Sequence, residues 1–103
     1  MYYTYMLRCE DNSIYTGITT DLNRRMDEHF NKSSKCAKYT LNHKAKKLEV
    51  AWQSDTRVLA SKLEYYIKKL SKPEKESLIQ NNNTLKDLLY NQIEHELYQK
   101  INL

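Results

Sequence analysis

Two neighbouring segments near the N-terminus, each with alternating side chains, constrain the fold of this chain more than any other feature. In residues 2–9 (YYTYMLRC) the odd positions share one face of a strand and the even positions share the other. Residues 14–19 (IYTGIT) alternate in the same way, and the polar residues 10–13 between them have the composition of a turn. The sequence therefore predicts a β-hairpin, and other parts of the chain must cover its apolar side chains.

The rest of the chain carries helical patterns with one further strand. Thr20 and Asp21 can cap a helix whose apolar residues are four apart, and a Ser-Lys-Pro-Glu capping box precedes a later one. Strict alternation returns over residues 48–53, which predicts a third strand. The expected helices cover residues 21–30, 56–70, 72–79 and 84–101.

This order of elements, ββαβααα, predicts a mixed α/β (α+β) domain with a small three-stranded antiparallel sheet flanked by helices. A chain of 103 residues has room for a single core. We expect residues 1–80 to form the main domain and residues 81–103 to add a helical extension packed on it. Cys9 and Cys36 lack the spacing of a disulfide framework or a metal site, so both thiols are expected to be free.

The charge of the chain fits an anionic partner. Its formal net charge is +4 and its pI is near 9.0, values that are also common among ordinary soluble proteins. Residues 31–47 are basic and contain no acidic residue, and Tyr39 among them can stack on a base or bind phosphate. The alternative for this segment is a solvated loop. The lysines that can contact phosphates are Lys32, Lys35, Lys38, Lys44, Lys46 and Lys47.

Five polar side chains are placed by these patterns at the edges of buried faces. Arg25 and His29 lie one turn apart on the border of the first helix, and Glu64 has a similar place on a later helix. Tyr5 and Tyr15 come from the two strands of the hairpin. If both helices pack on the sheet, these residues meet at one margin of the domain. Taken singly, each also has a plainer interpretation, as a strand residue, a surface cation or half of an exposed ion pair.

The chain contains a single glycine, Gly17, in the second strand of the hairpin. Glycine weakens a strand, so its presence there indicates a bulge, close packing, or the close approach of a backbone or a substrate. Gly17 follows Tyr15 by two residues and precedes the arginine-rich helix. We expect it to keep side-chain bulk away from this junction between strand and helix.

Taken together, these residues resemble the GIY-YIG nuclease domain, over about residues 2–79. Tyr3-Thr4-Tyr5 stands for the first motif of that family and Tyr15-Thr16-Gly17 for the second. Arg25 and Glu64 fill the two remaining key positions. The segments YTGITTDLNRR, AKYT and LEYYIKKLSKPEKESLI look like the small stand-alone bacterial members of the family.

The resemblance implies a metal-dependent endonuclease that hydrolyses DNA phosphodiester bonds, structure-selective or weakly specific, with a role in DNA repair or recombination. It assigns Glu64 to a single Mg²⁺ or Mn²⁺ ion and Arg25 to the phosphate. Tyr5 is then the general base, which requires nearby positive charge to lower its pKa from about 10. Tyr15 positions the water or the phosphate, or shares the role of base. His29 binds phosphate or assists the leaving group.

Two other classes of function fit the same sequence. One is a nucleic-acid-binding module that keeps the fold and cleaves little or nothing, and the other is a structural or interaction protein. DNA is the expected partner, with RNA and single strands left open, and the chain is expected to be a monomer or a weak homodimer. No apolar run is long enough to span a bilayer, so we expect a cytoplasmic location and no membrane partner.

Overall fold

The computed structural model of the chain confirms the hairpin. β1 covers Tyr2–Cys9 and β2 covers Ile14–Thr19, and the two strands pair antiparallel. Their register places Tyr5 opposite Gly17. The structure describes residues 1–31, 37–81 and 84–103.

The sheet has four strands in the order β2-β1-β3-β4, so the expectation of three strands is wrong. β3 covers Ala45–Ser54 and therefore begins earlier than the alternation over residues 48–53 indicated. The additional strand, β4, covers only Gln99–Lys100 and pairs with β3. All the pairings are antiparallel, as expected. β2 forms one edge of this sheet and β4 the other.

Three of the expected helices are confirmed, and their caps explain where they begin. α1 covers Leu22–Phe30, α3 covers Arg57–Lys68 and α4 covers Lys72–Gln80. The residue before each helix accepts a hydrogen bond from a backbone amide of the first turn through its side chain. These caps are Asp21, Thr56 and Ser71. α4 also has both hydrogen bonds of the capping box that its sequence predicts.

The prediction of one long C-terminal helix over residues 84–101 is wrong. The structure instead has a short α5 at Thr84–Leu88, a 3₁₀ turn η1 at His95–Leu97, and then β4. The apolar period nevertheless identified side chains that face the core. Those that are buried, in the same core as α3 and α4, are Leu85, Leu89 and Ile93.

Long-range hydrogen bonds explain why the last residues of the chain are not helical. The hydroxyl of Tyr98 donates to the carbonyl of Leu59 in α3 at 2.6 Å. The amide of Ile101 donates to the carbonyl of Ala51 in β3 at 2.9 Å. The free edge of β3 would otherwise leave its backbone groups without protein partners, and this segment supplies them. Such partners leave no trace in the local periodicity.

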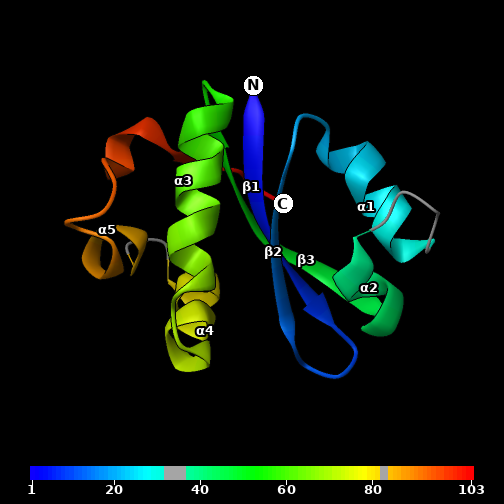
Figure 1. Cartoon of the computed structure of the whole chain (residues 1–103). Coiled ribbons are helices and arrows are strands. Elements are labelled where there is room, and N and C mark those ends of the chain that lie inside the picture. The colour runs from blue at the N-terminus through cyan, green and yellow to red at the C-terminus, as the bar shows by residue number, and fades with distance from the viewer. Residues whose placement is uncertain (32–36, 82–83) are drawn as a thin grey trace.

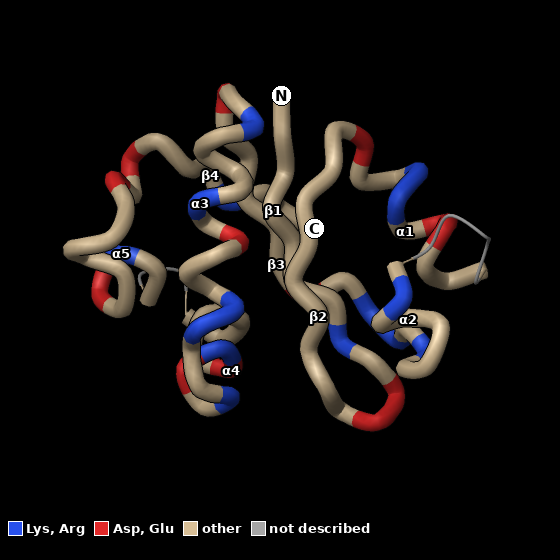
Figure 2. Tube along the Cα trace, viewed as in Figure 1, with Lys and Arg blue, Asp and Glu red and all other residues tan. Residues whose placement is uncertain are grey.

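The basic segment over residues 31–47 is partly regular rather than a loop. It contains a short helix, α2, at Lys38–Asn42, and its last residues begin β3. Basic segments gather around α2 in Figure 2. Cys9 is a free and buried thiol, whereas Cys36 lies outside the described residues. None of the described helices has the length and hydropathy of a bilayer-spanning segment.

Different helices cover the two faces of the sheet (Figure 1). α3 and α4 lie on one side, and α1 and α2 lie on the other. Met6 and Val50 pack into the core on the α3 side, with Leu63. Tyr5 and Leu7 belong to the second core cluster, which α1 completes. Alternation along β1 thus sends Tyr5 toward α1, as the sequence predicts.

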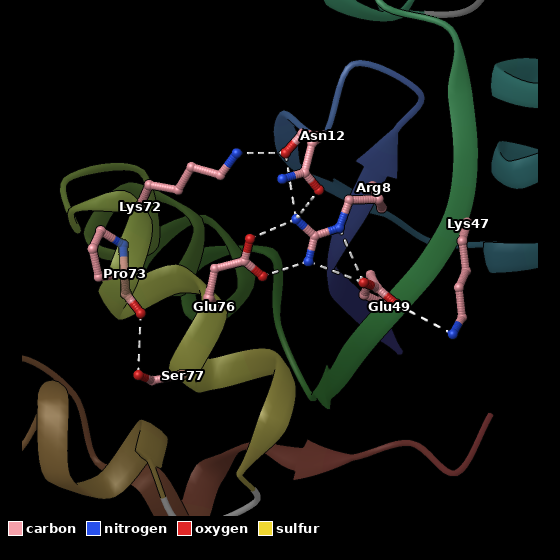
Figure 3. A network of polar contacts seen from close by, with 8 residues as sticks. All are labelled: Arg8, Asn12, Lys47, Glu49, Lys72, Pro73, Glu76 and Ser77. Carbon is pink, nitrogen blue, oxygen red and sulfur yellow. Dashed lines mark hydrogen bonds and ion pairs between the residues drawn. The ribbon is translucent and has the colours of Figure 1, made fainter.

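Arg8 ties the hairpin to β3 and α4 through one guanidinium group (Figure 3). It bonds both oxygens of Glu76, one of them at 2.6 Å, and its Nε donates to Glu49 at 3.1 Å. It also donates to the side chain of Asn12 at 3.1 Å. Asn12 has a φ of 68°, a left-handed conformation that asparagine tolerates in turns, and its carbonyl accepts from Lys72 at 2.6 Å.

We expect Arg8→Met to lower the free energy of unfolding by about 2 kcal/mol, because Glu49 and Glu76 lose their shared partner. Arg8 holds the pKa of Glu76 below its usual value. This contribution to stability is therefore present above the unfolded pKa of about 4.3 and is lost as the pH falls through the folded pKa. Urea unfolding of wild type and variant at several pH values measures both effects. A stability difference that stays constant down to pH 3 contradicts this account.

Candidate active site

The hydroxyl group of Tyr5 is the centre of a buried polar chain on the α1 side of the sheet. Tyr5 lies in β1 and His29 in the last turn of α1, and both have 0% of their surface exposed. The Tyr5 hydroxyl lies 2.7 Å from Nε2 of His29. The other ring nitrogen, Nδ1, lies 2.8 Å from Oγ1 of Thr40 in α2. β1, α1 and α2 therefore meet at one imidazole.

The hydroxyl of Thr40 determines which nitrogen of His29 carries the proton. A hydroxyl has one proton to donate, and that of Thr40 goes to the carbonyl of Ala37 at 3.0 Å. Burial and the positive charge of Arg25 lower the pKa of His29 to about 4, so its ring is neutral at physiological pH. The Nδ1–H of the neutral ring then donates to Thr40, which leaves Nε2 as an acceptor. The Tyr5 hydroxyl consequently donates its proton to His29.

Replacing Thr40 with valine leaves the Nδ1–H of His29 buried without an acceptor. We expect the free energy of unfolding to fall by about 1–3 kcal/mol, and the Nδ1–H tautomer of His29 to lose its preference. Urea unfolding and ¹⁵N NMR of the imidazole measure the two effects. Thr40→Ser keeps the hydroxyl and is expected to keep the tautomer. An unchanged imidazole spectrum in Thr40→Val means that Thr40 does not select it.

Arg25 brings a permanent positive charge to the Tyr5 hydroxyl. Its guanidinium group is hydrogen-bonded to Tyr5 and forms an ion pair with Glu28 at 2.8 Å. Burial raises the pKa of Tyr5, and the hydrogen bond from Arg25 opposes this without reversing it. Among the described protein groups the net shift of the Tyr5 pKa is therefore upward, so Arg25 alone does not supply the lowering that the role of general base requires. At neutral pH Tyr5 is a protonated phenol held between a cation and a neutral base.

Gly17 leaves room for this phenol. A Cβ atom at position 17 would lie 2.6 Å from Oη of Tyr5 and 2.8 Å from its Cζ. It would also lie 2.9 Å from Cε2 of Tyr15. Carbon atoms do not approach this closely without displacement, so any side chain here moves both rings. Of the interpretations of the single glycine, close packing agrees with this geometry.

Tyr15 extends the site into an aromatic cluster. Its ring centroid lies 6.2 Å from that of Tyr5, 5.5 Å from that of His29 and 5.4 Å from that of Tyr39. Tyr39 stacks in turn on His43, with centroids 4.2 Å apart and an interplanar angle of 17°. The buried Tyr5 hydroxyl is therefore bordered by a row of rings that leads toward α2.

Glu64 approaches the tyrosines from α3, on the other side of the sheet edge. Its carboxylate pairs with Lys68 at 3.3 Å, and Nζ of Lys68 lies 5.8 Å from the ring centroid of Tyr15. The charge of Glu64 is one of the influences that raise the pKa of Tyr5, so the carboxylate is within electrostatic reach of the phenol. The Glu64 side chain is 24% exposed. The structure thus brings the five predicted site residues into one neighbourhood.

Glu64 fits a single Mg²⁺ or Mn²⁺ ion better than a site made wholly of protein ligands. Among the residues that the structure describes, no group of three or more His, Cys, Asp or Glu side chains is arranged to hold a metal ion. Mg²⁺ commonly binds through one or two carboxylates, with water and phosphate oxygens completing its shell. A partly exposed carboxylate whose partner is an exposed lysine meets that requirement.

The predicted nucleic-acid contacts are more dispersed than the tyrosine site. Tyr39 is part of the aromatic cluster, and its neighbour Lys38 is exposed in α2. Lys44 and Lys47 form ion pairs with glutamates at 3.7 Å and 3.5 Å, and Lys46 is exposed. The remaining two predicted lysines, Lys32 and Lys35, lie outside the described residues.

Thr40 and Lys68 belong to this neighbourhood although the sequence did not indicate a role for either. Thr40 is the last residue of the AKYT segment, which attracted notice only for its resemblance. Lys68 follows Glu64 by four residues, a spacing that is also typical of exposed ion pairs. A contact with a ring in another element is what distinguishes Lys68 from such a pair.

Known proteins resemble this chain along most of its length. The family model described as the GIY-YIG catalytic domain matches residues 1–77. A UPF0213 protein of Fusobacterium nucleatum is 51% identical over 78 residues, which make up 76% of either chain. The UPF0213 protein YazA of Bacillus subtilis is 35% identical over 96 residues, covering 93% of this chain and 95% of its own.

A solved structure supports the same relationship at the level of the fold. The solution NMR structure of a UPF0213 protein from Bacillus halodurans aligns with a TM-score of 0.50 and 38% sequence identity. The alignment covers 78% of this chain and 84% of that one. The names of these relatives state no activity, so they add to the assignment of fold and family and leave the reaction to be argued from the site.

Proposed function

Because the chain belongs to the GIY-YIG family, we propose that it is a metal-dependent endonuclease that hydrolyses DNA phosphodiester bonds. The family is one of nucleases that act on DNA and generally use divalent metal ions. The observation that carries the proposal is the Tyr5 hydroxyl, held between the guanidinium group of Arg25 and the neutral ring of His29.

In this proposal Tyr5 and His29 activate the water as a pair. Since burial raises the pKa of Tyr5, a free phenolate is not the resting form of the base. Because Tyr5 has no exposed surface, the proposal requires the packing around its hydroxyl to open and admit the attacking water. Tyr5 then accepts a proton from that water and passes its own proton to Nε2 of His29, 2.7 Å away. Thr40 holds His29 in the tautomer that can receive this proton. His29 acts here as the final acceptor rather than as a phosphate ligand.

Arg25 and Tyr15 hold the phosphate in the same proposal. A guanidinium group presents its donors in a planar fork that matches two phosphate oxygens, and its charge persists at any working pH. Charge builds on those oxygens as the water attacks, so Arg25 stabilises the transition state more than the ground state. The ring of Tyr15 lies between the Tyr5 side of the site and Lys68, where it can position the phosphate or the water.

Glu64 is the residue that would hold the divalent ion. When bound, such an ion stabilises negative charge on phosphate oxygens and on the departing oxygen. Mg²⁺ and Mn²⁺ both suit one carboxylate with water and phosphate as further ligands. Glu64 would then give up its pairing with Lys68, which would leave the ammonium group of Lys68 available to the substrate.

The proposed selectivity is for DNA structure rather than for sequence. The exposed basic groups near the site, on α2 and at the beginning of β3, can neutralise phosphates without reading base edges. The aromatic row of Tyr15, Tyr39 and His43 suits unstacked bases in flaps or single strands. Substrates of this kind arise in DNA repair and recombination.

The proposal is tested with purified protein and four labelled DNAs, namely flapped, nicked, single-stranded and duplex. We expect cleavage of at least one DNA with Mg²⁺ or Mn²⁺, and none in EDTA. Glu64→Gln keeps the shape of the side chain and removes the charge, so its cleavage is expected to fall to the EDTA level. Glu94→Gln, at an exposed position before η1, is the matched control. Cleavage that survives Glu64→Gln refutes the role of Glu64, and no cleavage by wild type refutes the nuclease.

The second candidate is a module that binds nucleic acid without cleaving it. Two observations favour it. Burial raises the pKa of Tyr5 and lowers the pKa of His29 to about 4. Both shifts oppose base catalysis, because Tyr5 is harder to deprotonate and His29 is harder to protonate. Salt-sensitive binding of the same four DNAs without cleavage is the result that this candidate predicts.

A further inference from the structure

We propose that a cavity between the beginnings of α1 and α3 binds the phosphate backbone of the nucleic-acid strand, through the guanidinium groups of Arg24 and Arg57. The cavity has a volume of about 230 Å³ and lies beside the last residues of β2. Its lining residues are Tyr2, Ile18, Thr19, Thr20, Arg24 and Arg57. This inference rests on the proposed function, because it assumes that a strand occupies the neighbouring site.

The four arginines of the chain divide into two kinds. Arg8 is held by two glutamates, and Arg25 is paired with Glu28 and bonded to Tyr5. The guanidinium groups of Arg24 and Arg57 make no hydrogen bond or ion pair with any residue of the described part of the chain. Two exposed arginines whose guanidinium groups have no partner among the described residues therefore line one cavity from two different helices.

The lining of this cavity suits an anion. A tyrosine and two threonines accompany the two arginines, and no carboxylate belongs to the lining among the described residues. The hydroxyl of Thr19 is already hydrogen-bonded to the backbone of Asp21, so Tyr2 and Thr20 are the hydroxyl residues left for a ligand. The larger cavity nearby, of about 410 Å³, has the opposite character. Its lining includes Asp21 and, among the described residues, no cationic side chain. Thr20 lines both this cavity and the one with the two arginines. Among the described cavities, the one with Arg24 and Arg57 is thus the better match for phosphate.

The position of the cavity relative to the tyrosine site fits one continuous strand. Arg57 and Glu64 are seven residues apart in α3, so they lie on nearly the same face and about 10 Å apart along the helix axis. Arg24 directly precedes Arg25 in α1. Measured along the axis of a B-form duplex, about 10 Å corresponds to roughly three base-pair steps, at about 3.4 Å of axis per phosphate of each strand. The cavity can therefore hold the backbone a few nucleotides from the bond that is cut.

The arrangement of the helices agrees with this path. α1 and α3 lie on opposite sides of β2 and begin at the same end of the sheet (Figure 1), and both have basic segments near their beginnings (Figure 2). β2 is an edge strand, so a substrate that follows it meets α1 on one side and α3 on the other. Arg24 and Arg57 would bind phosphates of the same nucleic-acid strand from these two sides.

The test measures DNA binding in EDTA, where no cleavage occurs, by fluorescence anisotropy of labelled single-stranded and duplex oligonucleotides. Salt is varied from 50 to 200 mM. Removing one phosphate contact is expected to reduce the slope of log K against log salt by about 0.9 for duplex and about 0.7 for single strands. We expect this reduction and a loss of about 10-fold in affinity for each of Arg24→Ala and Arg57→Ala. Arg57→Lys keeps the charge and is expected to keep the slope.

The control variant is Lys86→Ala, which removes an exposed cation from α5, away from the cavity. It is expected to bind as wild type does. The inference is overturned if Arg24→Ala and Arg57→Ala keep the wild-type slope, if Lys86→Ala reduces it equally, or if wild type binds neither DNA. Cleavage with Mg²⁺ or Mn²⁺ is scored separately. A protein that binds through these two arginines and does not cleave supports this inference and contradicts the nuclease.

Discussion

Gly17→Ala is expected to disable the site while leaving the fold in place. The added Cβ would lie 2.6 Å from Oη of Tyr5 and 2.9 Å from Cε2 of Tyr15. Tyr5 is fully buried and cannot move into solvent, so its hydroxyl must shift relative to His29. Misplacement of a reacting group by about 1 Å costs about 100-fold in rate, and we expect at least that loss in DNA cleavage. Crowding of the core lowers the free energy of unfolding by about 1–3 kcal/mol.

The matched experiment combines Gly17→Ala with Tyr5→Phe. The phenylalanine lacks the oxygen that makes the closest contact, so part of the lost stability is expected to return. Cleavage is not expected to return, because the proton relay through Tyr5 is absent. Urea unfolding and cleavage rates of the two single variants and the double variant complete the cycle. Cleavage by Gly17→Ala at the wild-type rate means that the position of the Tyr5 hydroxyl does not matter to the reaction.

The elements that the sequence predicted well are those whose signals are local. The hairpin follows from alternation in β1 and β2, and the caps Asp21, Thr56 and Ser71 begin helices as their side chains indicate. The prediction for the C-terminal segment was wrong because the contacts that decide its structure are not local. Its partners lie in α3 and in β3, far away along the chain, and a strand of only two residues has no pattern of its own.

The candidate site shows the same division. Spacing placed Tyr5, Tyr15, Arg25 and His29 at a common margin, and the structure brings them together. Spacing could not show the balance between burial and charge at Tyr5, because that depends on how deeply the sheet is covered. It also could not assign the proton on His29, which depends on a hydroxyl contributed by α2. The sequence shows which titratable groups are present, whereas their protonation states depend on burial and hydrogen bonds in the folded protein.

Arg25→Ala is expected to reduce DNA cleavage by about 10³-fold, a larger effect than its cost in stability. The guanidinium group supplies the fixed positive charge beside the Tyr5 hydroxyl, and arginines that act on transferring phosphates contribute effects of this size. Its ion pair with Glu28 is largely buried, with 20% and 15% of the two side chains exposed, so its loss costs about 1–3 kcal/mol in unfolding free energy. Cleavage kinetics and urea unfolding separate the two effects.

Arg25→Lys and the titration of His29 show how the charge acts. Lysine restores the charge without the planar fork, so we expect an intermediate loss of about 10- to 100-fold. The charge of Arg25 also helps to lower the pKa of His29, so in Arg25→Ala that pKa is expected to rise above about 4, as NMR titration can measure. Lys62→Ala, at an exposed position of α3, is the control for net charge. If Arg25→Ala raises the pKa of His29 yet cleaves as wild type does, Arg25 tunes the imidazole but does not hold the phosphate.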